Sequence, residues 1–560
     1  MNNNLLININ TYLLTLLPIA LVTGPLIPEV IMFITLVIFL FITIREKQYK
    51  YYNNNFFKLF IIFFVIINLS TFLNFNLLSL KSSIFYFRVG FLSLAIWHVI
   101  DNNPKFIKYF FYTLSLLLIA IFIDSIIQII FKKNIIGLPI SPNGRVSSFF
   151  GDELVLGSYL ARIFPLFVSL FFVLKLRNKK FLISLLSIFF LINIILASSR
   201  VSLSIFILFI LIFIIFMKQR KYLIYLLSLF LVIVSISFAF NQTWVKRIFN
   251  HTLNQSMENN HFQVHSFRHT LHYLTAWNMF KSKPIFGYGP KSFRLNCNKE
   301  EFIPSKYIQK NNSVYAKNNG KINIQITGIN YITKTTTLDP LPSIARKNIF
   351  NNDDFINFIS KKNNKILSEN SRKKNNYIFE DEFLYIDIKQ FIFSEKLAEI
   401  AVDIDLVSDE QNFNIMRNNK NFNFFVNKNL LNDQNLSFKK DQLIIIKTSE
   451  YMNGCNTHPH NFYLQFLSEI GVVGFLILLL TYFYIFFVLL FNFFEKENFI
   501  TKPIKKYLKI KRIDFQSIVI LIGYLCILFP LFPSGNFFNN WMSIMFFLPM
   551  GFLIAGIYKK

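Results

Sequence analysis

Long apolar segments recur along almost the whole chain, with short polar links between them and one long polar stretch near the middle. Each apolar segment has about 18 to 25 residues, enough for a helix to cross a hydrocarbon core of roughly 30 Å. The pattern predicts a polytopic all-α membrane protein with about twelve spanning helices. Their expected positions are residues 5–23, 26–44, 56–75, 83–100, 107–131, 154–174, 181–197, 201–217, 222–240, 461–493, 515–533 and 538–557.

The long polar stretch divides the expected helices into two groups. Residues 1–240 contain helices 1 to 9, residues 241–460 form a large loop, and residues 461–560 contain helices 10 to 12. Within the loop, the amphipathic pattern of 245–293 predicts helix. The part at about 300–450 includes β-like runs such as KINIQITGINYITKTTT, AEIAVDIDLV and DQLIIIKTS, so we expect a small β-rich α+β insertion there.

Composition agrees with a membrane protein, since 53% of the residues are hydrophobic. The formal net charge of +28 would suggest a nucleic-acid partner in a soluble protein. Here many basic residues lie in short links between apolar segments, where topology and anionic lipids explain them, and no nucleic-acid partner is expected. The opening MNNNLLININ lacks a basic n-region, so we expect no cleavable signal peptide.

The distribution of Lys and Arg favours one orientation in the membrane. The links after expected helices 2, 6, 8 and 10 are rich in both, whereas FPSGNFFNN after helix 11 has no charge. The positive-inside rule therefore predicts that both termini are cytoplasmic and that the large loop lies on the outer side.

Two cysteines bracket the expected insertion. Cys297 and Cys455 both fall on the predicted outer side, where an oxidising compartment favours a disulfide that closes the base of the insertion. Two unrelated free thiols are the alternative. The third cysteine, Cys526, lies inside an expected helix and should pack as a small apolar side chain.

Ionisable residues within membrane helices are costly and usually functional. In this topology they fall in the outer halves of their helices, and they are Glu29, Arg88, Asp124, Glu153, Arg162 and Glu469. A polar site that opens outward suits an enzyme at the outer leaflet. A transporter would keep its binding groups near the midplane.

The border between the loop and the tenth helix, CNTHPHNFYLQFLSEIGVVG, carries candidate chemistry. On a helix, Gly471 and Gly474 follow His460 by about three and four turns and share its face. Glycines allow close packing, so this face should turn inward, with Asn461 at the helix start. A neutral imidazole can act as a general base; the alternative is a water-facing helix cap. His458 is interpreted as a loop residue.

This His-Asn pair, followed by nine residues and Gly-x-x-Gly, resembles the signature of the O-antigen ligase and polymerase superfamily. Three further segments resemble that family in the same order. They are GRVSSFFGDELVLGSYLARIFP with Arg145, ASSRVSLSIFILFI with Arg200, and FRHTLHYLTAWNMFKSKPIFGYGPKSF with Arg268 and Trp277. The resemblance covers roughly 140–293 and 455–495, and the insertion is longer than the family usually has.

The resemblance implies a GT-C-like, metal-independent, inverting glycosyltransferase without a cofactor, in a bacterial inner membrane with a periplasmic loop. Its partners would be a glycan donor on polyprenyl (undecaprenyl) diphosphate, an acceptor hydroxyl and membrane lipids. In ligases the acceptor is lipid A–core, and in polymerases of O-antigen or exopolysaccharide it is another lipid-linked repeat unit; the sequence does not separate the two.

The resemblance also assigns roles to residues. His460 would be the general base, and Arg145, Arg200 and Arg268 would bind the donor diphosphate, whose oxygens match the guanidinium fork. Arg162 and Glu153 are second candidates, for contact with the leaving group and for orienting a base or an arginine.

Other interpretations remain open. Four histidines at spacings of 4, 4 and 3 suit zinc in principle, namely His261, His265, His269 and His272, and His458 and His460 would add ligands. No cysteine or well-placed carboxylate joins them, so no metal site is expected. A transporter or flippase for lipid-linked glycans, and a non-catalytic scaffold, are the other functional classes. The candidate arginines could instead anchor the protein to lipid headgroups.

Overall fold

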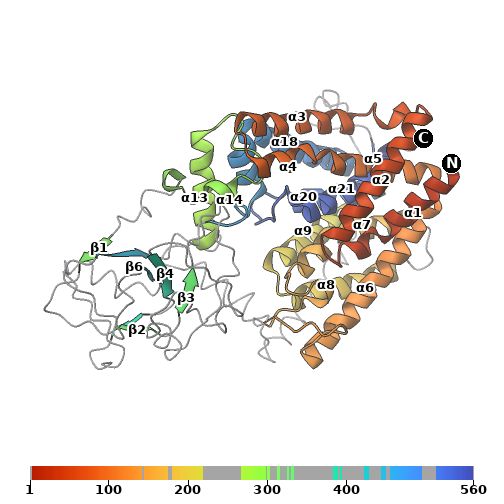
Figure 1. Cartoon of the computed structure of the whole chain (residues 1–560). Helices are drawn as coiled ribbons and strands as arrows, with labels where there is room; N and C mark the ends of the chain where they lie inside the picture. The colour runs from red at the N-terminus through yellow and green to blue at the C-terminus, as the bar shows by residue number, and fades with distance from the viewer. Residues whose placement is uncertain are drawn as a thin grey trace. The chain divides into compact units, whose positions relative to one another are not determined.

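The computed structural model describes most of the helical part of the chain and the strands of the large loop (Figure 1). The described residues are 3–141, 144–174, 179–218, 267–297, 299–302, 455–494 and 512–558, with strand segments between 312 and 448. The chain divides into two compact units. Unit 1 comprises Met1–His269, Phe280–Phe293 and His458–Lys560, and unit 2 comprises Thr270–Met279 and Arg294–Thr457.

Unit 1 is built from apolar helices. They are α1 (Asn3–Ala20), α2 (Leu26–Arg45), α3 (Asn55–Leu73), α4 (Leu77–Ile84), α5 (Phe87–Asn102), α6 (Lys105–Phe131), α7 (Leu156–Val173), α8 (Lys179–Leu196), α9 (Arg200–Phe216), α18 (Phe462–Phe493), α20 (Phe515–Ile527) and α21 (Asn540–Ile557). Two further helices, α13 (Phe267–Ser282) and α14 (Phe293–Asn296), include residues of both units.

Among the described helices, seven are long and apolar enough to cross a membrane, and three are shorter apolar helices. The expectation of an all-α, multi-pass membrane protein is therefore confirmed by helix length and composition. The total of twelve spans stays a prediction. The ninth expected span, 222–240, lies outside the described residues.

Asparagine and aspartate side chains fix where several helices begin. Asn54, Asn76, Asn461 and Asn539 each accept hydrogen bonds from backbone N–H groups of the following turn, and Asp514 does the same for α20. Such caps replace the partners that the first N–H groups of a helix lack. The abundant asparagines therefore have a local structural role at these helix starts.

Helix α20 is shorter than the sequence pattern suggests. We expected a span over 515–533, but the helix ends at Ile527. Pro530 and Pro533 lack the N–H that a helix interior requires, so the chain leaves the helix and continues as a loop to α21.

Contacts between helix termini define two ends of unit 1. At the first, called end A, the Asn3 side chain donates to Glu46 and the Asn55 backbone N–H donates to Tyr558 Oη at 3.3 Å. End A therefore contains the start of α1, the end of α2, the start of α3 and the end of α21. Both chain termini lie at this end, as the N and C marks in Figure 1 show.

The opposite end, called end B, contains the other termini of α1, α2, α3 and α21. Trp541 Nε1 donates to Leu21 O at 2.9 Å, which joins the start of α21 to the residue after α1. Tyr159 Oη in the first turn of α7 donates to Pro18 O at 3.1 Å. End B therefore also contains the start of α7.

The described part of the large loop includes short antiparallel strands. They are β1 (Asn312–Tyr315), β2 (Ile324–Ile326), β3 (Ile329–Ile332), β4 (Phe383–Ile388), β5 (Phe391–Phe393), β6 (Phe422–Asn427) and β7 (Leu443–Thr448). One sheet has the order β1-β7-β6-β4-β3, and β2 pairs with β5. The run KINIQITGINYITKTTT contains β2 and β3, and DQLIIIKTS contains β7, whereas AEIAVDIDLV lies outside the described residues.

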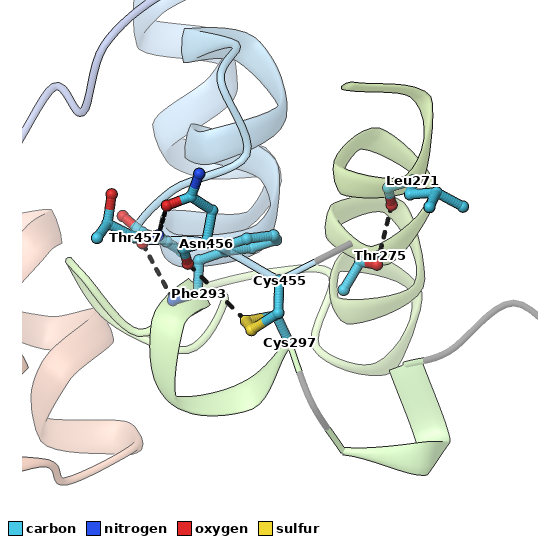
Figure 2. Close-up of a disulfide and its surroundings, with 8 residues drawn as sticks. Leu271, Thr275, Phe293, Cys297, Cys455, Asn456 and Thr457 are labelled. Atoms are coloured by element: carbon cyan, nitrogen blue, oxygen red, sulfur yellow. Dashed lines mark hydrogen bonds between the residues drawn. A yellow bond between two sulfur atoms is a disulfide. The ribbon is translucent and has the colours of Figure 1, made fainter. Parts of the chain in front are cut away.

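A disulfide joins Cys297 to Cys455 within unit 2, with the Cα atoms 5.2 Å apart (Figure 2). Cys297 directly follows α14, and Cys455 is followed by Asn456, whose side chain accepts a hydrogen bond from Thr457 N at 2.7 Å. The disulfide brings together two residues 158 positions apart. Cys526 in α20 is a buried free thiol, as expected.

Thiol labelling tests this pairing. Without reductant, the denatured protein should take up one maleimide, on Cys526, and after reduction it should take up three, because the chain has three cysteines. Mass spectrometry of the intact protein measures both numbers. The matched control Cys526→Ser should take up none without reductant, and uptake of three labels by the unreduced wild type would contradict the disulfide.

Candidate functional site

His460 lies before helix α18 rather than on it. Asn461 is the N-cap, in an extended conformation, and its side chain accepts from Tyr463 N at 3.0 Å and Leu464 N at 3.2 Å. His460 has a positive φ of 57°. The expectation that His460 shares a helical face with the glycines is therefore wrong, because the cap starts the helix two residues later. Asn461 does stand at the helix start, as expected.

The loop between α20 and α21 holds the segment around His460 by backbone hydrogen bonds. Ser534 N donates to His460 O at 2.8 Å, and Asn461 Nδ2 donates to Pro530 O at 2.8 Å. His458 Nε2 lies 3.2 Å from Ser534 O. A carbonyl oxygen only accepts, so this contact requires the proton of His458 on Nε2.

Three histidine rings pack together at this place. The ring centroid of His460 lies 4.1 Å from that of His458 and 5.1 Å from that of His269. His269 follows Arg268 in the first turn of α13, so the segments of two sequence motifs meet at His460. The sequence interpretation of His458 as a loop residue missed that its side chain is buried against His460.

The four histidines of the zinc alternative are only partly among the described residues. His261 and His265 lie outside the described residues. Among the residues that are described, no group of three or more His, Cys, Asp or Glu side chains could hold a metal ion.

Gly471 interrupts helix α18. Its backbone has φ 71° and ψ −167°, a conformation that glycine adopts without the penalty of a Cβ atom. The helical hydrogen bonds open here, and residues of another segment replace them. Val472 N donates to Pro284 O at 2.7 Å, and Val473 N donates to Ile285 O at 3.4 Å.

The inserted segment is the Pro-x-x-Gly-x-Gly motif at 284–289. Tyr288 N donates to Ser468 O at 3.2 Å, and Gly289 N donates to Glu469 O at 2.6 Å. A Cβ atom on Gly287 would lie 2.5 Å from Glu469 C, so only glycine fits. We call this pairing of 284–289 with 468–473 the glycine interlock.

Helix α3 contributes two side chains to the glycine interlock. Ser70 Oγ donates to Glu469 O at 3.0 Å and also contacts Phe286 O, and Asn74 Nδ2 donates to Gly287 O at 2.7 Å. The close approach expected at Gly471 is therefore present, but the neighbour is a loop rather than a helix. At Gly474 an added Cβ would meet Ile470 of its own helix, at 2.5 Å.

A buried polar network lies on the first two turns of α18. Glu469 is fully buried, and its carboxylate accepts from Phe293 N at 3.1 Å and from Gln465 Nε2 at 3.0 Å. Gln465 also bonds Asn536 Oδ1 at 2.8 Å and Phe537 N at 3.0 Å. The network therefore attaches the α20–α21 loop to α18 through hydrogen bonds, and the same loop bonds the backbone of His460. Glu469 stood out in the sequence, whereas neutral Gln465 and Asn536 gave no such signal.

The side chain of Arg145 bonds backbone oxygens in two links, the one between α8 and α9 and the one before α7. Its Nε donates to Ala197 O at 3.0 Å, in the link between α8 and α9, and its Nη2 donates to Leu154 O at 3.2 Å, just before α7. Arg200 begins α9 three residues after Ala197. The structure therefore brings Arg145 close to the segment that carries Arg200, at end B.

Polar side chains of α6 hold the loop that leads to Arg145. The buried Asp124 carboxylate accepts from Ile135 N at 2.9 Å and Ser148 Oγ at 2.6 Å. Gln128 Oε1 accepts from Ser147 N at 3.1 Å and Ser148 N at 2.8 Å. The intramembrane charge of Asp124, expected to be functional, thus fixes the backbone on both sides of Arg145.

The second candidates differ in environment. Arg162 is buried in α7, and its Nη1 donates to Ser158 O at 3.2 Å and to Ser158 Oγ. Glu153 is exposed in the link before α7. Arg145, Glu153 and the segment that carries Arg200 lie beside the start of α7, and Arg162 lies within that helix. His460 packs against His269, and the side chain of Arg268 lies outside the described residues. Their convergence in one cleft stays a prediction.

Comparison with known proteins bears on this arrangement. Residues 185–320 match the family model Wzy_C, described as O-antigen ligase. This segment is similar to an O-antigen ligase domain. The resemblance inferred from the sequence is thus confirmed there, and the matched segment includes Arg200 and Arg268 but neither Arg145 nor His460. No curated protein and no solved structure matches the chain.

The Wzy_C family covers O-antigen ligases and polymerases. The match covers residues 185–320 and shows what this segment is similar to. The apolar helices describe a multi-pass membrane protein by their length and composition.

The glycine interlock predicts a large effect of Gly471→Ala. A Cβ atom would lie 2.2 Å from Ile285 O and would strain the positive φ, so we expect a loss of more than about 3 kcal/mol in stability. Thermal unfolding of the detergent-purified protein measures it. The matched control is Gly24→Ala, where φ is 119° but nothing lies within 4 Å of the added atom. Equal losses in the two variants would contradict the interlock.

The α6 anchors predict local loosening of the Arg145 loop. Asp124→Ala removes the acceptor for Ile135 N and Ser148 Oγ, so amide exchange across 134–148 should accelerate about tenfold or more. Hydrogen–deuterium exchange with mass spectrometry reads this segment directly. Asp101→Ala removes an aspartate at end A whose side chain is 25% exposed, and it should leave the exchange of 134–148 unchanged. Unchanged exchange in Asp124→Ala would refute the anchoring role.

Proposed function

We propose that the protein is an O-antigen ligase-like glycosyltransferase at the periplasmic face of a bacterial inner membrane. It transfers a glycan from a polyprenyl diphosphate donor to an acceptor hydroxyl, with lipid A–core as the acceptor. The observation that carries the proposal is the packing of His460 against His269, the residue after Arg268. It joins the histidine segment to the segment that matches the family.

The orientation follows from the distribution of charge over the two ends. End A contains both termini and the basic link between α2 and α3, with Arg45, Lys47 and Lys50. The positive-inside rule makes end A cytoplasmic. End B, with His460 and the start of α7, then faces the periplasm, together with the large loop.

The chemistry is a single displacement at the anomeric carbon. Neutral His460 takes the proton from the acceptor hydroxyl as its oxygen attacks. The new glycosidic bond forms as the bond to the diphosphate oxygen breaks, and the diphosphate leaves with the electron pair, which inverts the configuration. Arg145, Arg200 and Arg268 neutralise the charge that develops on the leaving group, and the scheme uses no metal and no cofactor.

Asn461 and Ser534 support the base by fixing its backbone. The cap and the bond from Ser534 N to His460 O hold the histidine at positive φ, just before the first turn of α18. The N-terminus of that helix carries a positive partial charge, which favours the neutral imidazole that a base needs.

A repeat-unit polymerase of the same superfamily is the second candidate, since the family includes both. The two differ only in the acceptor. A transporter or flippase fits less well, because the polar networks described here lie at end B rather than at the middle of the helices.

Lipopolysaccharide gels of a deletion strain test the proposal. Loss of all glycan caps on the core identifies a ligase, and a single remaining repeat unit identifies a polymerase. Complementation with His460→Ala should restore nothing. Transfer by the purified variant should fall about a hundredfold or more, the usual contribution of a general base.

The control variant is Lys50→Ala, which changes an exposed pair at end A and should transfer at the wild-type rate. Wild-type transfer by His460→Ala, or transport of the lipid-linked glycan without bond formation, would overturn the proposal.

A further inference from the structure

The chain turns back on itself where helix α6 ends. Lys132, the first residue after the helix, has a positive φ of 61°, and this left-handed conformation ends α6 and changes the direction of the chain. Residues 132–140 then form a short hairpin. Ile140 N donates to Lys132 O at 2.9 Å. Asn134 N donates to Leu138 O at 2.9 Å. We call residues 132–140 the α6 hairpin.

Hydrogen bonds to α6 place the tip of the α6 hairpin well before the end of the helix. Helix α6 begins four residues after Asp101, at end A, and therefore ends at end B. Ile135 N donates to Asp124 Oδ1 at 2.9 Å, and Gln128 Nε2 donates to Leu138 O at 3.4 Å. Asp124 precedes the last residue of α6 by seven positions, about 10 Å along the axis. The hairpin therefore returns along α6, from end B toward the middle of the helices.

The backbone of the tip is satisfied by protein groups. Non-helical backbone is tolerated at membrane depth only where such partners exist. The buried Asn134 supplies them, since its Oδ1 accepts from Leu138 N at 2.7 Å and its Nδ2 donates to Ser148 O at 3.1 Å. Gly137 N donates to Asn134 O at 2.9 Å and closes the turn with a positive φ of 87°. The α6 hairpin thus meets the requirement for a loop within an apolar surrounding.

The tip exposes two large apolar side chains. Ile135 is 59% exposed and Ile136 is 63% exposed. At the same height on α6, the neighbour of Asp124 is Ile123, which is also exposed. Helix α6 is long and apolar enough to cross a membrane, so an exposed side chain at this height meets hydrocarbon rather than water. The two isoleucines of the tip therefore face the same surrounding as Ile123.

Two lysines stand at the base of the α6 hairpin. Lys132 and Lys133 are exposed directly after the end of α6, and neither forms an ion pair with a residue that the structure describes. The sequence has no acidic residue between Asp124 and Asp152. Lysines near the end of a spanning helix extend their charge to the headgroup region, where anionic lipids attract them. The chemistry of the base and that of the tip both suit a lipid leaflet.

We propose that the α6 hairpin is a re-entrant element that dips into the lipid leaflet at end B. Ile135 and Ile136 lie in the hydrocarbon of that leaflet, and Lys132 and Lys133 bind anionic headgroups at its surface. The partner is the bilayer itself. The inference goes beyond the proposed function and does not depend on glycan transfer.

The same side chains of α6 hold the hairpin and the loop that carries Arg145. The Asp124 carboxylate accepts from Ile135 N in the hairpin and from Ser148 Oγ beyond Arg145. Gln128 Oε1 accepts from Ser148 N at 2.8 Å, while its Nε2 donates to the hairpin. Lipid that holds the tip in place therefore also steadies the Arg145 loop.

Spin labels measure the depth of the tip. In a Cys526→Ser background the two remaining cysteines form the disulfide, so a nitroxide attaches only to the cysteine of Ile136→Cys. In nanodiscs of phosphatidylcholine and phosphatidylglycerol, this label should collide more often with oxygen than with a water-soluble nickel chelate. Ile123→Cys on α6 should behave in the same way. The matched control Asp152→Cys, in the exposed link before α7, should give the reverse order.

Two results would overturn the proposal. The first is a label at Ile136→Cys that prefers the nickel chelate as Asp152→Cys does, because the tip would then lie in water. The second is low accessibility to both reagents together with spin–spin broadening, which would assign the tip to a contact with a second copy of the chain. Ile135→Cys should reproduce the result of Ile136→Cys, and thermal unfolding checks that both variants fold.

The double variant Lys132→Gln/Lys133→Gln tests the headgroup contact. With the wild-type lysines, removal of phosphatidylglycerol should lower the ratio of oxygen to nickel collisions at Ile136→Cys about twofold or more. With the double variant this ratio should be the same in both lipid mixtures. The matched control Lys105→Gln/Lys108→Gln, in the first turn of α6 at the other end, should respond like the wild type. A wild-type response in the Lys132→Gln/Lys133→Gln variant would overturn the headgroup contact.

Discussion

The rest of unit 1 depends on the break in α18 at Gly471, where a second chain segment supplies the hydrogen bonds that the helix gives up. Backbone polar groups inside an apolar unit must find partners, and here they find them in 284–289 rather than in the next helical turn. The pairing fixes the distance between the 284–289 segment and α18, because a side chain at Gly287 or Gly471 would push the two apart. His460 directly precedes the Asn461 cap of α18, and its ring packs against that of His269 in the first turn of α13.

The polar networks share one design, in which neutral donors rather than cations satisfy buried carboxylates. Asp124 and Glu469 each accept backbone N–H bonds, and each fixes a loop that carries or holds a candidate residue. A hydrogen bond from a backbone N–H to a buried carboxylate holds that part of the backbone in place. A long lysine or arginine side chain as the partner would hold it less firmly. Arg162 is the exception, since its buried Nε has no hydrogen-bond partner among the described residues.

The length of the apolar segments predicted most helices, because a helix that crosses a bilayer needs a long apolar run and such runs are rare for other reasons. It failed at two helix boundaries, because α20 ends at Ile527 ahead of Pro530 and because the Asn461 cap begins α18 after His460. A helical wheel drawn across Gly471 also could not anticipate a glycine with positive φ. Charged residues of the site stood out in the sequence. Gln465, Asn536 and Ser534 did not, since a neutral polar side chain or a backbone contact gains meaning only from its partners in space.

The disulfide of unit 2 has a consequence for how this chain can vary. Its two cysteines place the ends of a long insertion 5.2 Å apart, about the separation of residues in neighbouring strands. A segment that leaves and returns at nearly the same point can grow, shrink or be exchanged without altering the spacing of whatever flanks it. The Cys297–Cys455 bridge thus allows the insertion between the two cysteines to change in length and sequence while the helices keep theirs.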